Sequence, residues 1–158
     1  MRYRRAVIGA AAGVAVLGAL SGCSTINSFL HDTFPDQFGP QRDANGRVEA
    51  PVNAHSYYLE VGDCFSFPDP SDHNEVTIVP CAEDHLLQVI GQGELSLQEE
   101  RTLGAQNAVS AKCADPFAAF EQSAPAGSHP DQEFLITQAE VDGRTVTKYS
   151  CAASLVKL

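Results

Sequence analysis

The chain of 158 residues has no tryptophan, a single methionine, and only 10 lysines and arginines against 20 aspartates and glutamates. Its net charge of −10 argues against a nucleic-acid-binding protein, because phosphate contacts need clustered Lys and Arg side chains. It also lacks an apolar run of about 20 residues, the length that a membrane-spanning helix requires. With 19% charged and 44% hydrophobic residues, it does not have the composition of a disordered chain.

The motifs of several common enzyme classes are absent from the sequence. No serine lies in a G-x-S-x-G pattern, no H-E-x-x-H is present, and no Gly-rich phosphate loop follows an expected strand. We therefore predict that the protein is not an enzyme and that it carries no cofactor and no metal.

The first 23 residues are organised like an export signal. Three arginines precede a run of fifteen residues, 6–20, that contains no charged or polar side chain, which is typical of a secretory signal peptide. The run ends in Leu-Ser-Gly and Cys23, which resembles the lipobox of bacterial lipoproteins. This resemblance implies that residues 1–22 are cleaved and that Cys23 takes a diacylglycerol and palmitate. An ordinary signal peptide or an uncleaved anchor with an incidental cysteine is the alternative.

We expect the mature chain to be lipid-anchored on the extracytoplasmic face of the cell membrane. Cleavage before Cys23 leaves 136 residues with a net charge of −13, which anionic lipids repel, so the acyl chains must provide the anchor. Residues 23–54 contain three prolines and an Asn-Gly pair and show no regular period. They predict a flexible tether, followed by a globular domain at 55–158.

Four cysteines remain once Cys23 is lipidated, an even number that predicts two disulfides in an exported protein. Three pairings are open. We favour Cys64–Cys81 and Cys113–Cys151, which close loops of moderate size. The alternative is a metal site that combines cysteines with histidines, although no two cysteines form a C-x-x-C pattern.

One main helix is expected in the middle of the domain. Ser96 and Glu99 have the spacing of a capping box, and the helix is predicted over 97–114, with Cys113 on its inward face. The pair Asp115-Pro116 is expected to end this helix and to open a short second one.

Segments of β-branched, aromatic and alternating apolar residues predict a small antiparallel sheet. The fold class is therefore α+β, with the sheet packed against the main helix and stapled by two disulfides. The expected strands are 57–61, 75–79, 86–90, 133–138 and 149–156, with Asp142-Gly143 as the turn between the last two.

Two short strings of residues resemble the septum-formation domain of actinobacterial envelope proteins. They are Val-Gly-Asp-Cys-Phe at 61–65 and Val-Pro-Cys at 79–81, followed by His85. The later helix with its cysteine and a Gly-Arg pair at 143–144 also fit, so the resemblance covers about residues 58–156.

The chain departs from that family in two ways. Members usually carry a tryptophan before the last Gly-Arg segment, where this chain has Val141, and many hold two copies of the domain where this chain holds one. The resemblance implies an extracytoplasmic module linked to septum formation and brings no catalytic chemistry with it.

Four polar residues are candidates for a binding site. Asp63 follows a glycine at an expected strand end, where the alternative is a turn residue that bonds backbone N–H groups. Glu83, Asp84 and His85 form a polar cluster that could serve acid–base chemistry or hold a metal, with a solvated turn as the alternative.

The leading hypothesis is a non-catalytic binding or scaffolding module of the cell envelope, whose partner is an envelope or division protein. The alternative is a small enzyme or metal-dependent factor centred on Glu83, Asp84 and His85. A third hypothesis is a structural accessory lipoprotein that has no ligand.

Overall fold

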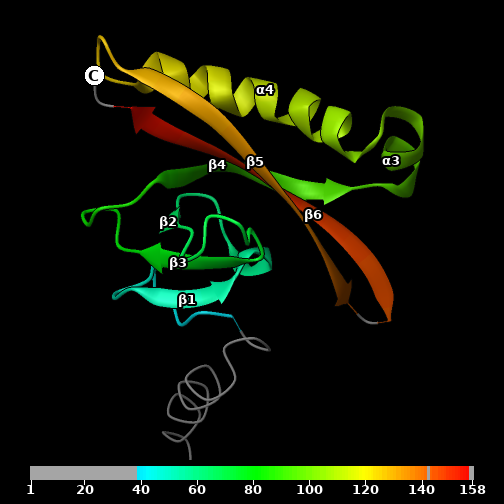
Figure 1. Cartoon of the computed structure of the whole chain (residues 1–158), viewed down its shortest axis with the longest axis horizontal. Helices are drawn as coiled ribbons and strands as arrows, with labels where there is room; N and C mark the ends of the chain where they lie inside the picture. Colours follow the sequence, from blue (N-terminus) through cyan, green and yellow to red (C-terminus); the bar gives the residue numbers. More distant parts are fainter. Residues whose placement is uncertain (1–38, 142, 157–158) are drawn as a thin grey trace, which may run out of the picture.

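The computed structural model describes residues 39–141 and 143–156, so the predicted signal peptide, Cys23 and the first part of the expected tether lie outside the described residues. Within the described ranges, no helix is long and apolar enough to cross a membrane. The elements in chain order are β1 (Val52–His55), the 3₁₀ helix η1 (Ser56–Tyr58), β2 (Cys64–Ser66), β3 (Glu75–Val79), β4 (Leu87–Leu95), α3 (Leu97–Leu103), α4 (Ala105–Ser123), β5 (His129–Val141) and β6 (Arg144–Val156) (Figure 1).

The strands form one antiparallel sheet in the order β1-β3-β2-β4-β6-β5, with α4 as its main helix. This confirms the predicted α+β fold. Strands β5 and β6, of 13 residues each, make a long hairpin that closes between Val141 and Arg144. Gly143 lies in that turn with φ +71°, a conformation that glycine adopts without strain. Both strands extend well beyond the segments predicted from the sequence.

The sheet curls so that η1, next to its first strand, reaches β5 at the opposite edge. Ser56 Oγ lies 3.0 Å from Thr137 Oγ1, within hydrogen-bond distance, and both residues are buried. The curl encloses the larger of two hydrophobic clusters, which we call the inner core. Its buried members are Val48, Ala54, Leu59, Phe65, Val76, Ile78, Leu87, Val89, Leu135 and Ala152.

The second cluster, the helix core, lies on the other face of the sheet, where α4 packs along β4, β5 and β6 (Figure 1). Alternation along β6 separates the two, because Ala152 belongs to the inner core and Cys151 to the helix core. The buried members of the helix core are Leu95, Ala108, Val109, Cys113 and Cys151, with Ile90, Ala105, Phe134, Ile136 and Tyr149 packed against them.

Both disulfides pair as favoured from the sequence. Cys64 in β2 bonds Cys81 just after β3, and Cys113 in α4 bonds Cys151 in β6. Cys113 and Cys151 are fully buried, whereas Cys81 is exposed. The first bridge therefore lies at the surface and the second lies inside the helix core.

The prediction of one helix over 97–114 is wrong at both ends of α4. The helix is interrupted at Gly104, whose φ of +75° separates α3 from α4. Helix α4 then continues through Pro116 to Ser123. Packing compensates for the backbone hydrogen bond that proline cannot donate. A Cβ on Gly91 would come within 2.9 Å of Pro116 Cγ, so the glycine allows the proline ring to lie directly on β4.

Two strand predictions also need correction. Residues 57–61 form no strand, because the chain turns through η1 and then through a turn at Gly62, where φ is +98°. Strand β4 does not stop at Gly91 but continues to Leu95, with a register shift between Val89 and Gly91 that is typical of a β-bulge.

The predicted domain start at residue 55 is too late. β1 pairs with β3 from Val52 onward, Val48 is 6% exposed in the inner core, and Arg42 is bonded to Asp63. The prolines and glycines of the expected tether correctly indicated irregular backbone before β1. In residues 39–51, however, this irregular backbone packs against the sheet and is part of the domain.

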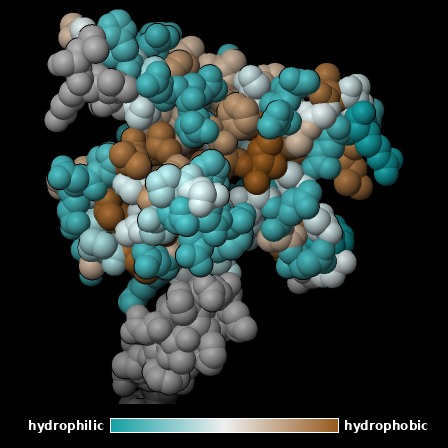
Figure 2. Space-filling view, in the orientation of Figure 1, coloured by the Kyte–Doolittle hydropathy of each residue, from teal (hydrophilic) through white to brown (hydrophobic). Residues whose placement is uncertain are grey.

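The surface of the face shown in Figure 2 is mostly hydrophilic, with a short band of hydrophobic side chains between the α4 layer at the top and the β1–β3 part below. Within residues 39–141 and 143–156, the large hydrophobic side chains that are exposed come from three segments: the turn before β2, the residue before β4, and the two ends of α3. They are Val61, Leu86, Leu97 and Leu103.

Candidate functional site

A polar network joins the residues before β1 to the turn before β2. Arg42 donates to both carboxylate oxygens of Asp63, at 2.7 and 2.8 Å, and its Nε lies 3.6 Å from Glu60 Oε1. The side chains of Arg42 and Asp63 are 12% and 5% exposed, so the ion pair is largely screened from water. A two-pronged arginine–carboxylate pair of this kind fixes orientation as well as charge.

The same arginine also bonds backbone on both sides of the pair. Its guanidinium donates to the carbonyl oxygens of Tyr58 at 3.0 Å and Gly46 at 2.9 Å. Burial acts to lower the pKa of Arg42, but the hydrogen bond to Asp63 and the charges of Asp63 and Glu60 outweigh it, so the pKa is raised. Arg42 therefore stays charged and holds the N-terminal segment on the domain.

Asp63 closes the turn that carries it. Its Oδ2 accepts a hydrogen bond from the backbone N–H of Glu60 at 2.8 Å, as in the turn interpretation of this residue. Two backbone hydrogen bonds, each of 2.8 Å, join the turn to β4: Gly62 N–H donates to the Val89 carbonyl, and Val89 N–H donates to the Asp63 carbonyl. The carboxylate is thus committed to contacts within the fold.

Lys148 of β6 reaches the same region from the long hairpin. Its Nζ donates to the carbonyl oxygens of Tyr57 at 2.7 Å and Leu59 at 2.8 Å, and lies 5.1 Å from the centre of the Tyr57 ring. Burial, only partly offset by the charge of Glu60, lowers the pKa of Lys148. This lysine satisfies carbonyl groups that η1 leaves without helical partners.

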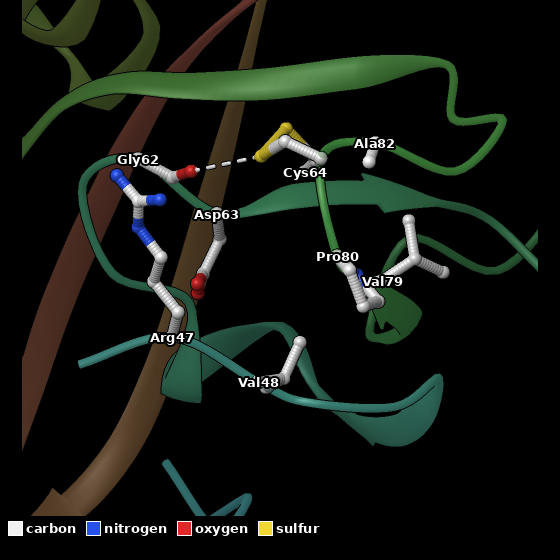
Figure 3. A pocket seen from close by; sticks show the side chains of 9 residues that line it. Arg47, Val48, Gly62, Asp63, Cys64, Val79, Pro80 and Ala82 are labelled. Atoms are coloured by element: carbon white, nitrogen blue, oxygen red, sulfur yellow. Dashed lines mark hydrogen bonds between the residues drawn. A yellow bond between two sulfur atoms is a disulfide. The ribbon is translucent and has the colours of Figure 1, made fainter. Parts of the chain in front are cut away.

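Beside this network lies an open cavity of 210 Å³, which we call the Arg47 hollow (Figure 3). Arg47 forms one side, Val48 and Pro80 face each other across the space, and the Cys64–Cys81 disulfide lies at the top in that view. The residues that line it are Arg47, Val48, Gly62, Asp63, Cys64, Val79, Pro80, Cys81 and Ala82.

The cluster of Glu83, Asp84 and His85 follows directly after that disulfide. All three residues are exposed, and His85 Nδ1 lies 2.8 Å from the carbonyl oxygen of Glu83. Glu83 N–H in turn donates to the Pro80 carbonyl at 2.8 Å, so the segment begins as a tight turn. Across residues 39–141 and 143–156, no group of three or more His, Cys, Asp or Glu residues has the arrangement of a metal site.

Of the four candidate residues, Asp63 alone lines the hollow, whereas Glu83, Asp84 and His85 are not among its lining residues. Three further residues of this region, Arg42, Arg47 and Lys148, were not predicted from the sequence. The two arginines lay in the expected tether. Lys148 carried one signal: after Arg144 at the start of β6, it is the one charged residue in that strand.

A second polar group ties α3 to α4 and confirms the predicted capping box. Ser96 Oγ accepts from Glu99 N–H at 3.2 Å, and Glu99 Oε2 accepts from Ser96 N–H at 2.9 Å. Glu99 Oε1 also bonds Lys112 Nζ at 2.8 Å. The hydrogen bonds from Lys112 and then from Ser96 lower the pKa of Glu99 to about 2.

Comparisons of the chain with family models, with curated proteins and with solved structures gave no significant match.

Proposed function

We propose that the protein is a non-catalytic binding or scaffolding module of the cell envelope, held on the extracytoplasmic face of the membrane by a diacylglycerol on Cys23. The observation that supports this proposal most directly is the closure of both disulfides, which is what oxidising compartments outside the cytoplasm favour. Bridged sulfurs are also unavailable as nucleophiles or as thiolate ligands.

The buried and half-buried charged groups support the same proposal. Arg42, Asp63 and Lys148 are all engaged in bonds that fasten one segment of the fold to another. A catalytic group must instead have an atom free to meet a substrate. We therefore assign these residues to holding a surface in shape and not to chemistry.

The position of the domain start limits where such a module would work. Fifteen residues, 24–38, separate Cys23 from Gly39, which is buried in the domain. A chain of that length spans at most about 50 Å, since each residue adds no more than about 3.3–3.6 Å. The domain would meet membrane proteins or the part of the wall nearest the membrane, and the resemblance suggests the division septum as the place to look.

The anchor is tested on the native protein isolated from the membranes of its own cells. Intact mass should fit a chain that starts at Cys23 with diacylglycerol and palmitate attached, and should rise by about 4 Da on reduction of two disulfides. A Cys23→Ala variant should lose both the lipid mass and the membrane fraction. An unmodified chain starting at residue 1, or one without the mass gain, would contradict the proposal.

The binding role is tested by photo-crosslinking in living cells. A photoreactive residue is placed at an exposed position of the full chain, at Ala114 on α4 or at Ala82, and Cys23→Ala chain is co-expressed as competitor. We expect a discrete adduct whose yield the competitor lowers, unchanged by His85→Ala. Absence of a discrete adduct at every position tried would contradict a binding role, and its loss with His85→Ala would favour the alternative site at residues 83–85.

A further inference from the structure

The Arg47 hollow has walls that fit a small, partly apolar ligand. Val48, Val79 and Pro80 give it an aliphatic side, and the Cys64–Cys81 bridge adds an apolar wall. Its volume of 210 Å³ is below the roughly 300–1,000 Å³ of pockets that take drug-sized molecules. The space therefore suits one side chain of valine or leucine size with a single polar group.

The charge that faces this space is positive. Asp63 is the one acidic residue in the lining, and Arg42 already holds both of its carboxylate oxygens. Arg47 is the one cation in the lining, and its side chain extends up to Gly62 at the rim (Figure 3).

The guanidinium N–H groups of Arg47 are available to a ligand. Its backbone N–H donates to Asp43 Oδ1 at 2.8 Å, and its positive charge contributes to lowering the pKa of that exposed aspartate. Among the described residues, the structure shows no hydrogen bond or ion pair from the Arg47 guanidinium itself. An arginine in this position matches the planar oxygens of a carboxylate.

We propose that the hollow binds a monocarboxylate bearing a short branched aliphatic group, with Arg47 pairing the carboxylate and the aliphatic group filling the space between Val48 and Pro80. A polyanion is disfavoured, because the hollow offers one available cation in a chain of net charge −10. This inference rests on the proposed binding function and names the ligand class for it. Two sources carry this chemistry: a free branched-chain acid, or the C-terminal residue of a peptide.

Gly62 keeps one side of the Arg47 hollow open. Its φ of +98° is a conformation that other residues adopt only with strain, and beyond the two adjacent residues no atom lies within 4 Å of the place where a Cβ would be. The missing side chain leaves the rim beside Arg47 and the disulfide open to a ligand.

The test is saturation-transfer NMR on the purified full chain, with four probes: isovalerate, isovaleramide, N-acetyl-glycyl-valine and its C-terminal amide. We expect both acids to bind, the amides to bind about tenfold more weakly, and Arg47→Gln to weaken the acids by a similar factor, since a hydrogen bond to a charged group is lost. Ala82→Leu, at an exposed rim position, should weaken all four probes. The stronger acid identifies the source of the ligand.

Arg101→Gln serves as the matched control, because Arg101 is exposed on α3 and does not line the hollow. It should leave binding unchanged. Equal binding of acids and amides, an equal loss with Arg101→Gln, or no binding of either acid would each overturn this proposal. Those results would leave the crosslinking at Ala114 intact, so the ligand assignment and the general binding role fail separately.

Discussion

The two hydrophobic clusters of this domain are stabilised in different ways. The inner core buries large side chains completely, with Phe65, Leu59 and Ile78 at 0% exposed. Apart from Leu95, the helix core buries smaller side chains, and its aromatic members Phe134 and Tyr149 remain partly exposed. The disulfides differ as well: Cys113–Cys151 lies inside the helix core, whereas Cys64–Cys81 belongs to neither cluster and ends at the exposed Cys81.

The two disulfides therefore stabilise this fold in different ways, one inside a hydrophobic cluster and one at the surface. Apolar burial stabilises in proportion to the area removed from water, so the inner core holds together by the size of its side chains. The helix core buries less per residue, and the covalent bond supplies what packing does not. The ion pair of Arg42 and Asp63 then secures the N-terminal segment that covers the inner core.

The largest expected effect comes from removing the bridge within the helix core. The Cys113–Cys151 loop spans 38 residues and the Cys64–Cys81 loop 17, so a chain-entropy account assigns them about 4 and about 3 kcal/mol of unfolding free energy. We expect the Cys113→Ala/Cys151→Ala chain to unfold at lower denaturant than the Cys64→Ala/Cys81→Ala chain. Urea unfolding of the two double variants and the parent measures this.

Partial reduction sharpens the same comparison without a substitution. Because Cys81 is exposed and both sulfur-bearing residues of the other bridge are buried, a limiting dithiol should open Cys64–Cys81 first. Alkylation followed by peptide mass analysis identifies the opened pair. Opening of Cys113–Cys151 first, or equal loss of stability in the two double variants, would show that the two bridges are equivalent.

Removing one partner of the buried ion pair is expected to cost about 3 kcal/mol, because Asp63 would keep its charge without compensation. Arg42→Met retains most of the side-chain length but also removes the hydrogen bonds to the Tyr58 and Gly46 carbonyls, so the pairing has to be isolated by a second substitution at Asp63. Thermal unfolding of Arg42→Met, Asp63→Asn and the double variant would measure it as a double-mutant cycle. Strictly additive losses would mean that the two side chains act independently, contrary to their 2.7 Å contact.

Adding a methyl group between β4 and α4 tests the packing of the helix core directly. In Gly91→Ala the new Cβ lies 2.9 Å from Pro116 Cγ in a rigid ring, and overpacking of this kind costs about 2 kcal/mol. Gly93→Ala is the matched control on the same strand, since the atoms it meets at 2.6 to 3.0 Å are the hydroxyl and two outer ring carbons of Tyr149, at the end of a partly exposed side chain that can move more easily than a proline ring. Calorimetry should show the larger loss for Gly91→Ala.

The local patterns in the sequence predicted what local forces decide. The strand at 75–79 and the capping box of Ser96 and Glu99 are correct to the residue, because alternation and cap chemistry act over a few positions. The disulfide pairing was also correct. Local signals gave the wrong end for the main helix, because a residue distant in the sequence determines it. Pro116 remains helical since Gly91 leaves room for its ring.

The candidate site was harder to predict than the fold for the same reason. Arg42 and Asp63 are 21 residues apart, and no pattern in the residues near Arg42 indicates that it pairs with Asp63. Proline, glycine and asparagine mark irregular backbone, but they do not distinguish a packed segment from a free one. The Arg47 hollow depends on three segments meeting, which no single stretch of sequence contains.

The smallest expected effect concerns the start of α3, next to the helix core, and depends on pH. Because the folded pKa of Glu99 is lowered from 4.5 to about 2, its bonds with Lys112 and Ser96 stabilise the fold above about pH 4.5. That contribution is lost as the pH falls through about 2, where the carboxylate is protonated in both states. Glu99→Gln should therefore be less stable than the parent at pH 7, with the gap in Tm closing between pH 4.5 and 2. A gap that stays constant over this range would show that the loss of stability does not come from the charge of Glu99. In either case, the experiment measures how much the surface contact between Glu99 and Lys112 adds to the stability of the helix core, apart from the contribution of the Cys113–Cys151 bridge.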